Sequence, residues 1–127
     1  MTRILIADDS AHVRRALRAC LELNSNWKVC GEAGDGRTAI DAVRDTKPDV
    51  VLLDYAMPGM NGLEAAREIA SISPGTAMLL FTMYASPHLE SMAQDVGIRA
   101  TISKSVGGVN AIVDAIEALD WSAPHRP

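Results

Sequence analysis

The sequence predicts an α/β domain in which a doubly wound sheet of five parallel strands carries five helices on its two faces. Two observations support this prediction. Short aliphatic or β-branched runs alternate along the chain with stretches whose apolar residues recur at helical spacing. The 127 residues suffice for one domain with a core of its own, and 48% of them are apolar. Strands that alternate with helices in this way form parallel βαβ units with right-handed crossovers.

The predicted elements follow one another as far as Leu119. The apolar runs that we assign to strands are Ile4–Ala7, Trp27–Glu32, Val50–Leu53, Met78–Phe81 and Ala100–Ser103. Helical apolar stripes follow them, the first extending from Val13 to Asn24 and the others beginning at Ala39, Leu63, Leu89 and Val109. Ser86 and Pro87 are typical of a helix start, and Gly97 is typical of a helix end. We expect a domain over residues 1–119, with residues 120–127 as an irregular tail or the start of a linker.

Charge and apolar run length narrow the class of protein. A net charge of −4 argues against nucleic-acid binding by this domain, because phosphate binding requires a concentrated basic surface. The N-terminal apolar run is too short for a signal peptide, and no run is long enough to span a membrane. Cys20 and Cys30 belong to no metal-binding spacing, so we expect both thiols to be reduced and buried. These features predict a cytoplasmic protein without membrane contact.

Polar residues stand at the carboxyl ends of four predicted strands. Asp8 and Asp9 follow the first strand, and Asp54 follows the third. Thr82 follows the fourth strand and Lys104 the fifth. In an open α/β sheet, ligands bind beyond the carboxyl ends of the strands, where the strand order reverses. With the order 2-1-3-4-5, these side chains would share one small crevice.

The composition of this crevice predicts phosphoryl chemistry. Three adjacent carboxylates repel one another, so they must protonate or bind a cation, and oxygen ligands at this density favour Mg²⁺. Lys104 can pair with phosphoryl oxygens, and Thr82 can donate a hydrogen bond to another. Asp54, at the centre, is placed as a nucleophile that would form an aspartyl phosphate. The sequence therefore predicts Mg²⁺-dependent phosphoryl transfer to Asp54.

With these residues in this strand–helix order, the sequence resembles the receiver domain of bacterial two-component response regulators. The resemblance runs from about Arg3 to Leu119 and includes the segments ILIADDS, LLDYAMPGMNGLEAAREI and GIRATISKS. The segment LLFTM is most similar to receivers of LuxR-like regulators. The resemblance implies a flavodoxin-like fold with the strand order given above.

The resemblance also implies a role for each residue of the crevice. Asp54 would be the phosphoacceptor, with a histidine kinase, a phosphotransfer protein or a small acyl phosphate as donor. Asp9 and Asp54 would ligate Mg²⁺ directly, Asp8 through water, and Ala56 through its backbone carbonyl. Thr82 would turn toward the phosphoryl group while Lys104 forms an ion pair with it.

The output that the resemblance implies is a conformational shift rather than catalysis. The surface formed by the fourth helix, the fifth strand and the fifth helix would change shape, and homodimers could form through the fourth and fifth helices. Such a protein is not an enzyme beyond slow self-phosphorylation and self-dephosphorylation. Arg14, Arg15 and Arg18 could meet an acidic kinase surface, but we interpret them as a solvated helix face.

The sequence departs from the family pattern near Lys104. Family members usually carry Tyr or Phe three residues before this lysine, a ring that turns inward on activation, and here that position is Thr101. Tyr84, two residues after Thr82, is a candidate for a replacement lever or for a gate on attacking water. The alternative is a tyrosine that is merely exposed on its loop. Ser105 stands where proline commonly follows the lysine.

Two other functions remain as alternatives. A flavodoxin-like FMN carrier is disfavoured because Asp8 and Asp9 would repel the FMN phosphate. A receiver-like module that works by protein contact alone, without phosphorylation, is the second alternative, and Thr101 leaves room for it. The sequence identifies neither the kinase nor the output. It is compatible both with a stand-alone receiver and with part of a DNA-binding regulator.

Overall fold

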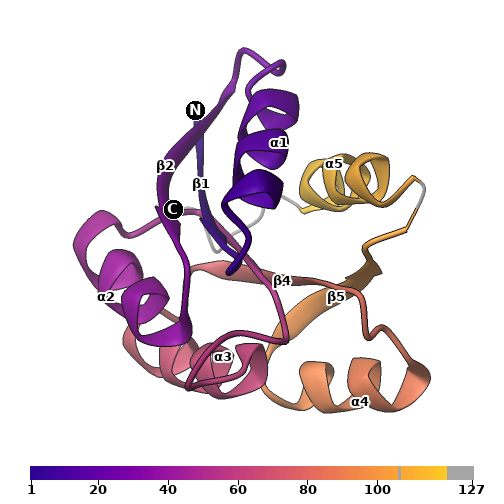
Figure 1. Cartoon of the computed structure of the whole chain (residues 1–127). Helices are drawn as coiled ribbons and strands as arrows, with labels where there is room; N and C mark the ends of the chain where they lie inside the picture. The colour runs from indigo at the N-terminus through magenta and orange to yellow at the C-terminus, as the bar shows by residue number, and fades with distance from the viewer. Residues whose placement is uncertain (106, 120–127) are drawn as a thin grey trace.

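The chain forms three layers in the computed structural model, with a parallel sheet between two layers of helices (Figure 1). The structure describes residues 1–105 and 107–119. The strands are β1 (Thr2–Ala7), β2 (Trp27–Ala33), β3 (Val50–Leu53), β4 (Ala77–Thr82) and β5 (Ile98–Ser103). The helices are α1 (Ala11–Leu21), α2 (Gly36–Thr46), α3 (Gly62–Ile72), α4 (Pro87–Asp95) and α5 (Gly108–Ala118). The sheet order β2-β1-β3-β4-β5 confirms the predicted fold. The predicted tail over residues 120–127 lies outside the described residues.

The central strands separate two cores because successive side chains point to opposite faces of the sheet. Leu5 and Val51 belong to the core cluster that packs against α2, α3 and α4. Ile6 and Leu52 belong to the cluster that packs against α1 and α5. Figure 1 shows these two groups of helices on opposite sides of the sheet. All four residues of β3 are buried, which explains why this strand is an uninterrupted apolar run.

The register of the sheet brings the functional loops to one edge. Ala7 of β1 pairs with Leu53 of β3, and Thr82 of β4 pairs with Ser103 of β5. All these pairings are parallel, so the carboxyl ends of the four strands point the same way. The residues that follow β1, β3 and β5 therefore emerge at the same edge of the sheet.

The helix boundaries agree with the predicted capping signals in α4. Ser86 caps this helix by accepting a hydrogen bond from the backbone N–H of Leu89, and Pro87 is its first residue. Gly97 follows α4 with a φ of 95°, a left-handed conformation that glycine adopts at little cost. The predicted start and end of the fourth helix are therefore confirmed.

The predicted extent of the first helix was wrong by about one turn. Helix α1 ends at Leu21, whereas the apolar stripe was expected to continue to Asn24. The Asn24 side chain instead accepts a 2.9 Å hydrogen bond from the backbone N–H of Asn26. Such local side-chain bonds compete with helical hydrogen bonding and favour turns. Strand β5 also begins two residues before its predicted start, because Ile98 is buried and pairs with Met78.

Cys20 and Cys30 are free thiols, but both are half-buried, not buried as predicted. Cys30 lies on β2, at the edge of the sheet, and Cys20 lies beside the buried positions Leu17 and Leu21 of α1. Among the described residues, no helix is long and apolar enough to cross a membrane.

Candidate functional site

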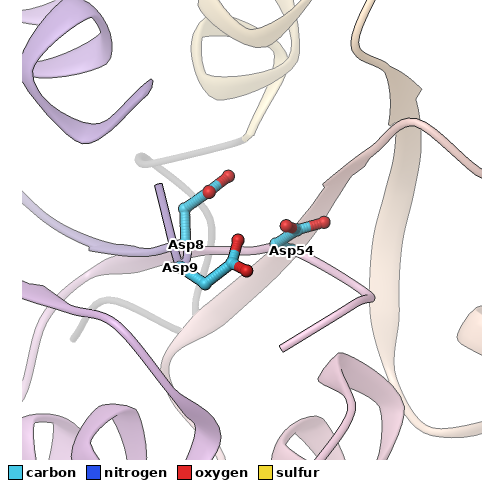
Figure 2. Close-up of side chains that lie close together, drawn as sticks. All are labelled: Asp8, Asp9 and Asp54. Carbon is cyan, nitrogen blue, oxygen red and sulfur yellow. The ribbon is translucent and has the colours of Figure 1, made fainter. Parts of the chain in front are cut away.

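Three carboxylates meet at the carboxyl edge of the sheet. Asp8 and Asp9 follow β1 and Asp54 follows β3, and Figure 2 shows their side chains grouped together. One oxygen atom from each carboxylate lies within 4.8 Å of the others. Asp8 and Asp54 are 2% and 5% exposed, whereas Asp9 is open to solvent. The structure thus brings together the three carboxylates that the ends of the first and third strands predicted.

Asp8 is held by its backbone and by its side chain. Its N–H donates a 2.9 Å hydrogen bond to the Ala33 carbonyl, and its Oδ1 accepts one of 2.9 Å from the Ser10 N–H. Its carbonyl accepts a 2.7 Å bond from Nη1 of Arg14, whose Nε lies 3.0 Å from Oε1 of Glu32. The interpretation of Arg14 as part of a solvated helix face was therefore wrong. Arg14 ties α1 to the loop that carries Asp8.

Lys104, one residue after β5, bridges two of the carboxylates. Its Nζ lies 2.6 Å from Oδ2 of Asp8 and 3.1 Å from Oδ2 of Asp54. The same atom lies 5.7 Å from the centre of the Phe81 ring. Burial alone would lower the pKa of Lys104, but the hydrogen bonds and charges of Asp8 and Asp54 outweigh burial and raise the pKa. Lys104 is therefore charged at neutral pH and held toward the carboxylates.

Asp54 lies in an environment that disfavours its charge. Burial is the largest cause that raises the pKa of Asp54, the charges of Asp8 and Asp9 raise it further, and the contact with Lys104 opposes them. Three carboxylates and one ammonium leave a net charge of −2 in the site. A divalent cation would balance this charge, and carboxylate oxygens are the donors that hard divalent ions prefer. The residues present therefore fit a metal ion.

A cavity of about 350 Å³ opens over the carboxylates. Its lining consists of Asp8, Asp9, Ser10, Val13, Asp54, Ala56, Met83, Tyr84 and Lys104. Ala56, which is exposed on the loop between β3 and α3, lines the same cavity as the three carboxylates. The cavity has room for a hydrated ion together with a phosphoryl group.

The loop that carries Asp54 is packed closely against the start of α3. The N–H of Gly62 donates a 2.8 Å hydrogen bond to the Tyr55 carbonyl. A Cβ atom at Gly62 would collide with the carbonyl oxygen of Asp54, so this position requires glycine. Gly59, in the same loop, has a φ of 77°, which also favours glycine. The glycine-containing segment after Asp54 therefore fixes the backbone of the candidate nucleophile.

Thr82 differs from the other predicted site residues. Its side chain is fully buried and is absent from the described residues that line the cavity. Its Oγ1 accepts a 3.1 Å hydrogen bond from the Tyr84 N–H, and its carbonyl accepts one of 2.9 Å from the Lys104 N–H. The backbone of Thr82 thus lies beside the site, while its hydroxyl is engaged with its own loop.

Comparison with known proteins decides what this arrangement is. The model of the response regulator receiver domain family matches residues 4–117, nearly the whole length of the chain. The chain belongs to the response regulator receiver domain family. Receiver domains act in two-component signal transduction, where they interact with histidine kinases or phosphotransfer proteins.

Individual relatives agree with this receiver assignment. Protein CcdB of Bacillus subtilis is 34% identical over 104 residues, which cover 82% of this chain and 86% of that protein. The transcriptional regulatory protein YdfI of Bacillus subtilis is 33% identical over 104 residues, but the chain spans only 48% of its length. A LuxR-family response regulator from Aurantimonas superposes with a TM-score of 0.88 and 33% identity, over 94% of this chain and 85% of that one. The predicted similarity to receivers of LuxR-like regulators is therefore confirmed.

Two positions near the receiver site hold features that sequence reasoning did not anticipate. The Tyr84 ring, on a residue that is 61% exposed, meets the Tyr55 ring edge-on, with 6.4 Å between the ring centres and an interplanar angle of 67°. Thr101 carries a buried Oγ1 that has no hydrogen-bond partner within residues 1–105 and 107–119. Tyr55 directly follows Asp54, and this adjacency was the signal from which its position at the site could have been inferred.

Proposed function

We propose that this chain is a phosphorylation-dependent switch of a two-component system, in which Asp54 accepts a phosphoryl group in a Mg²⁺-dependent reaction. One observation carries the proposal: three carboxylates within 4.8 Å share a site with Lys104, which leaves an uncompensated charge of −2. If these side chains formed structural ion pairs alone, their positive and negative charges would be expected to balance. An excess that matches one divalent ion favours a site that is completed by a metal and an incoming phosphoryl group.

The metal would be held by oxygen atoms of this chain. Asp9 and Asp54 are assigned as direct ligands, Asp8 as a ligand through water, and the Ala56 carbonyl as the backbone ligand. When bound, Mg²⁺ would neutralise the carboxylates and draw the oxygens of the phosphoryl donor into the cavity. The exposure of Asp9 supports this assignment, because an ion must enter the cavity from solvent.

The transfer step requires few groups. A carboxylate oxygen of Asp54 attacks the phosphorus atom of a phosphohistidine on the kinase or phosphotransfer protein. The new O–P bond forms as the N–P bond breaks, and the electron pair of that bond leaves with the imidazole nitrogen. Lys104 would pair with the phosphoryl oxygens, and the Thr82 hydroxyl would donate to another. The protein thereby contributes alignment and charge neutralisation.

The output would be a change in the surface formed by α4, β5 and α5, with a homodimer through α4 and α5 as one form that this change could stabilise. CcdB is nearly covered by this chain, whereas YdfI is about twice as long and is a transcriptional regulatory protein. The relatives thus support either a stand-alone receiver or the receiver of a DNA-binding regulator. We propose residues 1–119 as the receiver and residues 120–127 as a tail or linker, in a cytoplasmic protein.

Mass spectrometry after incubation with acetyl phosphate tests the proposal. We expect one added phosphoryl group in the presence of Mg²⁺, none after chelation with EDTA, and none in Asp54→Asn. Asp95→Asn is a matched control, because it removes an exposed carboxylate from α4, away from the site. Wild-type protein that stays unmodified by acetyl phosphate would instead support the module that acts by protein contact alone.

A further inference from the structure

The Thr82 hydroxyl is turned away from the site in which it is expected to act. Its Oγ1 accepts a hydrogen bond of 3.1 Å from the Tyr84 N–H, which closes a tight turn at the end of β4. Thr82 is fully buried, whereas Met83 and Tyr84 are 76% and 61% exposed. To reach a phosphoryl group on Asp54, Thr82 must rotate, and the turn that holds it must open.

The Tyr84 ring contacts a residue of the loop that follows β3 and carries Asp54. The ring meets that of Tyr55 edge-on, at 6.4 Å and 67°, which is a favourable arrangement for an aromatic pair. Tyr55 is firmly placed: it packs against the core, and its carbonyl accepts a hydrogen bond from the N–H of Gly62. Tyr84, which is 61% exposed, is therefore the less constrained partner, and the contact joins the β3–α3 loop to the β4–α4 loop.

Strand β5 offers no ring that could take part in this movement. Position 101 is a threonine, and its Oγ1 is buried without a hydrogen-bond partner among the described residues. The aromatic contact that links the Thr82 loop to the site thus comes from Tyr55, directly beside Asp54. The structure shows the ring pair formed, and its separation would be a second, discrete arrangement.

We infer that Tyr84 is a positioning residue for Thr82, and that the Tyr55–Tyr84 ring contact holds the Thr82 hydroxyl away from the site until Asp54 is phosphorylated. The inference rests on the proposed function and specifies its regulation. Phosphorylation draws Thr82 toward Asp54, the turn at Tyr84 opens, and the two rings separate. Loss of the ring contact alone should favour the same state, because one interaction that opposed it is gone.

The two tyrosines of the chain make this movement observable. Protein labelled with fluorotyrosine gives one fluorine NMR signal per tyrosine. Tyr55→Phe leaves only the Tyr84 label and keeps a ring beside it, whereas Tyr55→Leu leaves the same label and removes the ring. In Tyr55→Phe we expect the Tyr84 signal to shift when acetyl phosphate and Mg²⁺ are added. In Tyr55→Leu the signal should lie near the shifted position before any phosphoryl donor is present.

The rate of phosphoryl uptake, followed by mass spectrometry, supplies a second measurement. Removal of one aromatic contact should raise this rate about two- to ten-fold in Tyr55→Leu relative to Tyr55→Phe. Tyr84→Leu should show a similar increase, and it tests the same contact at an exposed position where the fold is not at risk.

The outcomes separate this inference from the proposed function. Phosphoryl uptake with an unmoved Tyr84 signal, or with equal rates in the leucine and phenylalanine variants, would overturn the ring contact as a switch and leave phosphorylation standing. Wild-type protein that takes up no phosphoryl group would overturn both. The inference is supported if the Tyr84 signal shifts on phosphorylation in Tyr55→Phe and already lies near the shifted position in Tyr55→Leu. Faster phosphoryl uptake in both Tyr55→Leu and Tyr84→Leu would support it as well.

Discussion

Asp54 is the residue at which burial and function oppose each other most directly. Burial and then the charges of Asp8 and Asp9 raise its pKa, against the effect of Lys104. Between the ordinary pKa of an aspartate and this raised value, the folded state binds more protons than the unfolded state. Stability therefore falls as the pH rises through that window, and at neutral pH the ionised Asp54 reduces the stability of the fold.

Asp54→Asn should consequently stabilise the protein at neutral pH in metal-free buffer, because it removes a buried charge and keeps an oxygen for Lys104. We expect a gain on the order of 1 kcal/mol, measured as the free energy of urea unfolding. The gain should shrink as the pH falls through the raised pKa of Asp54 and the ordinary aspartate pKa of about 3.9, because the carboxyl group then becomes protonated in both states. An asparagine variant that is less stable than wild type at neutral pH would contradict this account.

At the same scale, the strand ends allowed the carboxylates and Lys104 to be predicted, but not the orientation of Thr82. A residue that follows a parallel strand must emerge at the carboxyl edge of the sheet, whatever its side chain. The rotamer of Thr82 instead depends on a hydrogen bond to the backbone of Tyr84, which only the conformation of the loop determines. Arg14 was misread for a related reason, since its partners are a carbonyl and a carboxylate from two other elements.

At the scale of elements, Glu32 of β2 connects the sheet to α1. Its Oε1 lies 3.0 Å from Nε of Arg14 and its Oε2 lies 2.8 Å from Nε of Arg18. Burial raises the pKa of Glu32, but the hydrogen bonds and charges of Arg18 and Arg14 outweigh it and lower the pKa. A carboxylate with a lowered pKa stabilises the fold above its unfolded-state pKa, and this contribution is lost as the pH falls through the folded-state value.

Glu32→Gln should therefore lower the free energy of unfolding at neutral pH by about 1 kcal/mol. At acidic pH the difference from wild type should shrink, and it is lost as the pH falls through the lowered folded-state pKa of Glu32. Urea denaturation of both proteins at the two pH values measures the effect. Added salt should reduce it, since the pair is partly exposed. A penalty that is equal at both pH values would show that packing, and not charge, accounts for the role of Glu32.

The junction between the Asp54 loop and α3 depends on Gly62. In Gly62→Ala, the new methyl group collides with the Asp54 carbonyl, so the loop or the helix must shift. We expect a loss of about 1–3 kcal/mol in the free energy of unfolding, and weaker Mg²⁺ binding because Asp54 moves with the loop. Gly75→Ala is the matched control, since no atom lies within 4 Å of a Cβ atom at that position. Equal stability of the two alanine variants would exclude the proposed close packing.

The elements themselves were largely predictable because their apolar patterns are set by the two cores. The four-residue run of β3 was identified without error. A strand that is buried on both faces is apolar throughout, so the sequence shows clearly where it begins and ends. The end of α1 was misplaced because Leu21 and Asn24 fit one helical stripe. The turns that follow the helix instead form through local hydrogen bonds, one of which joins the Asn26 N–H to the Asn24 side chain. Apolar periodicity predicts which elements exist, and local polar contacts decide where they stop.

At the scale of the whole molecule, we expect the uncompensated charge of the site to couple the stability of the fold to divalent cations. The three carboxylates come from loops that follow β1 and β3, so they converge only when the sheet is formed. An ion that binds this arrangement binds the folded state and not the unfolded chain. Its effect on stability therefore follows mass action, and it should reach about 2.7 kcal/mol at a Mg²⁺ concentration one hundred times the Kd.

We accordingly expect the melting temperature of wild-type protein to rise with the logarithm of Mg²⁺ concentration above the Kd. The rise should be strongly reduced in Asp9→Asn, which removes an exposed ligand with little effect on the core, and unchanged in Asp114→Asn, which removes an exposed carboxylate from α5. The rise should also weaken under mildly acidic conditions, because the raised pKa of Asp54 makes protons compete with the metal. A melting temperature that does not change with Mg²⁺ concentration, or that rises equally in both variants, would mean that the three carboxylates do not act together as a metal site.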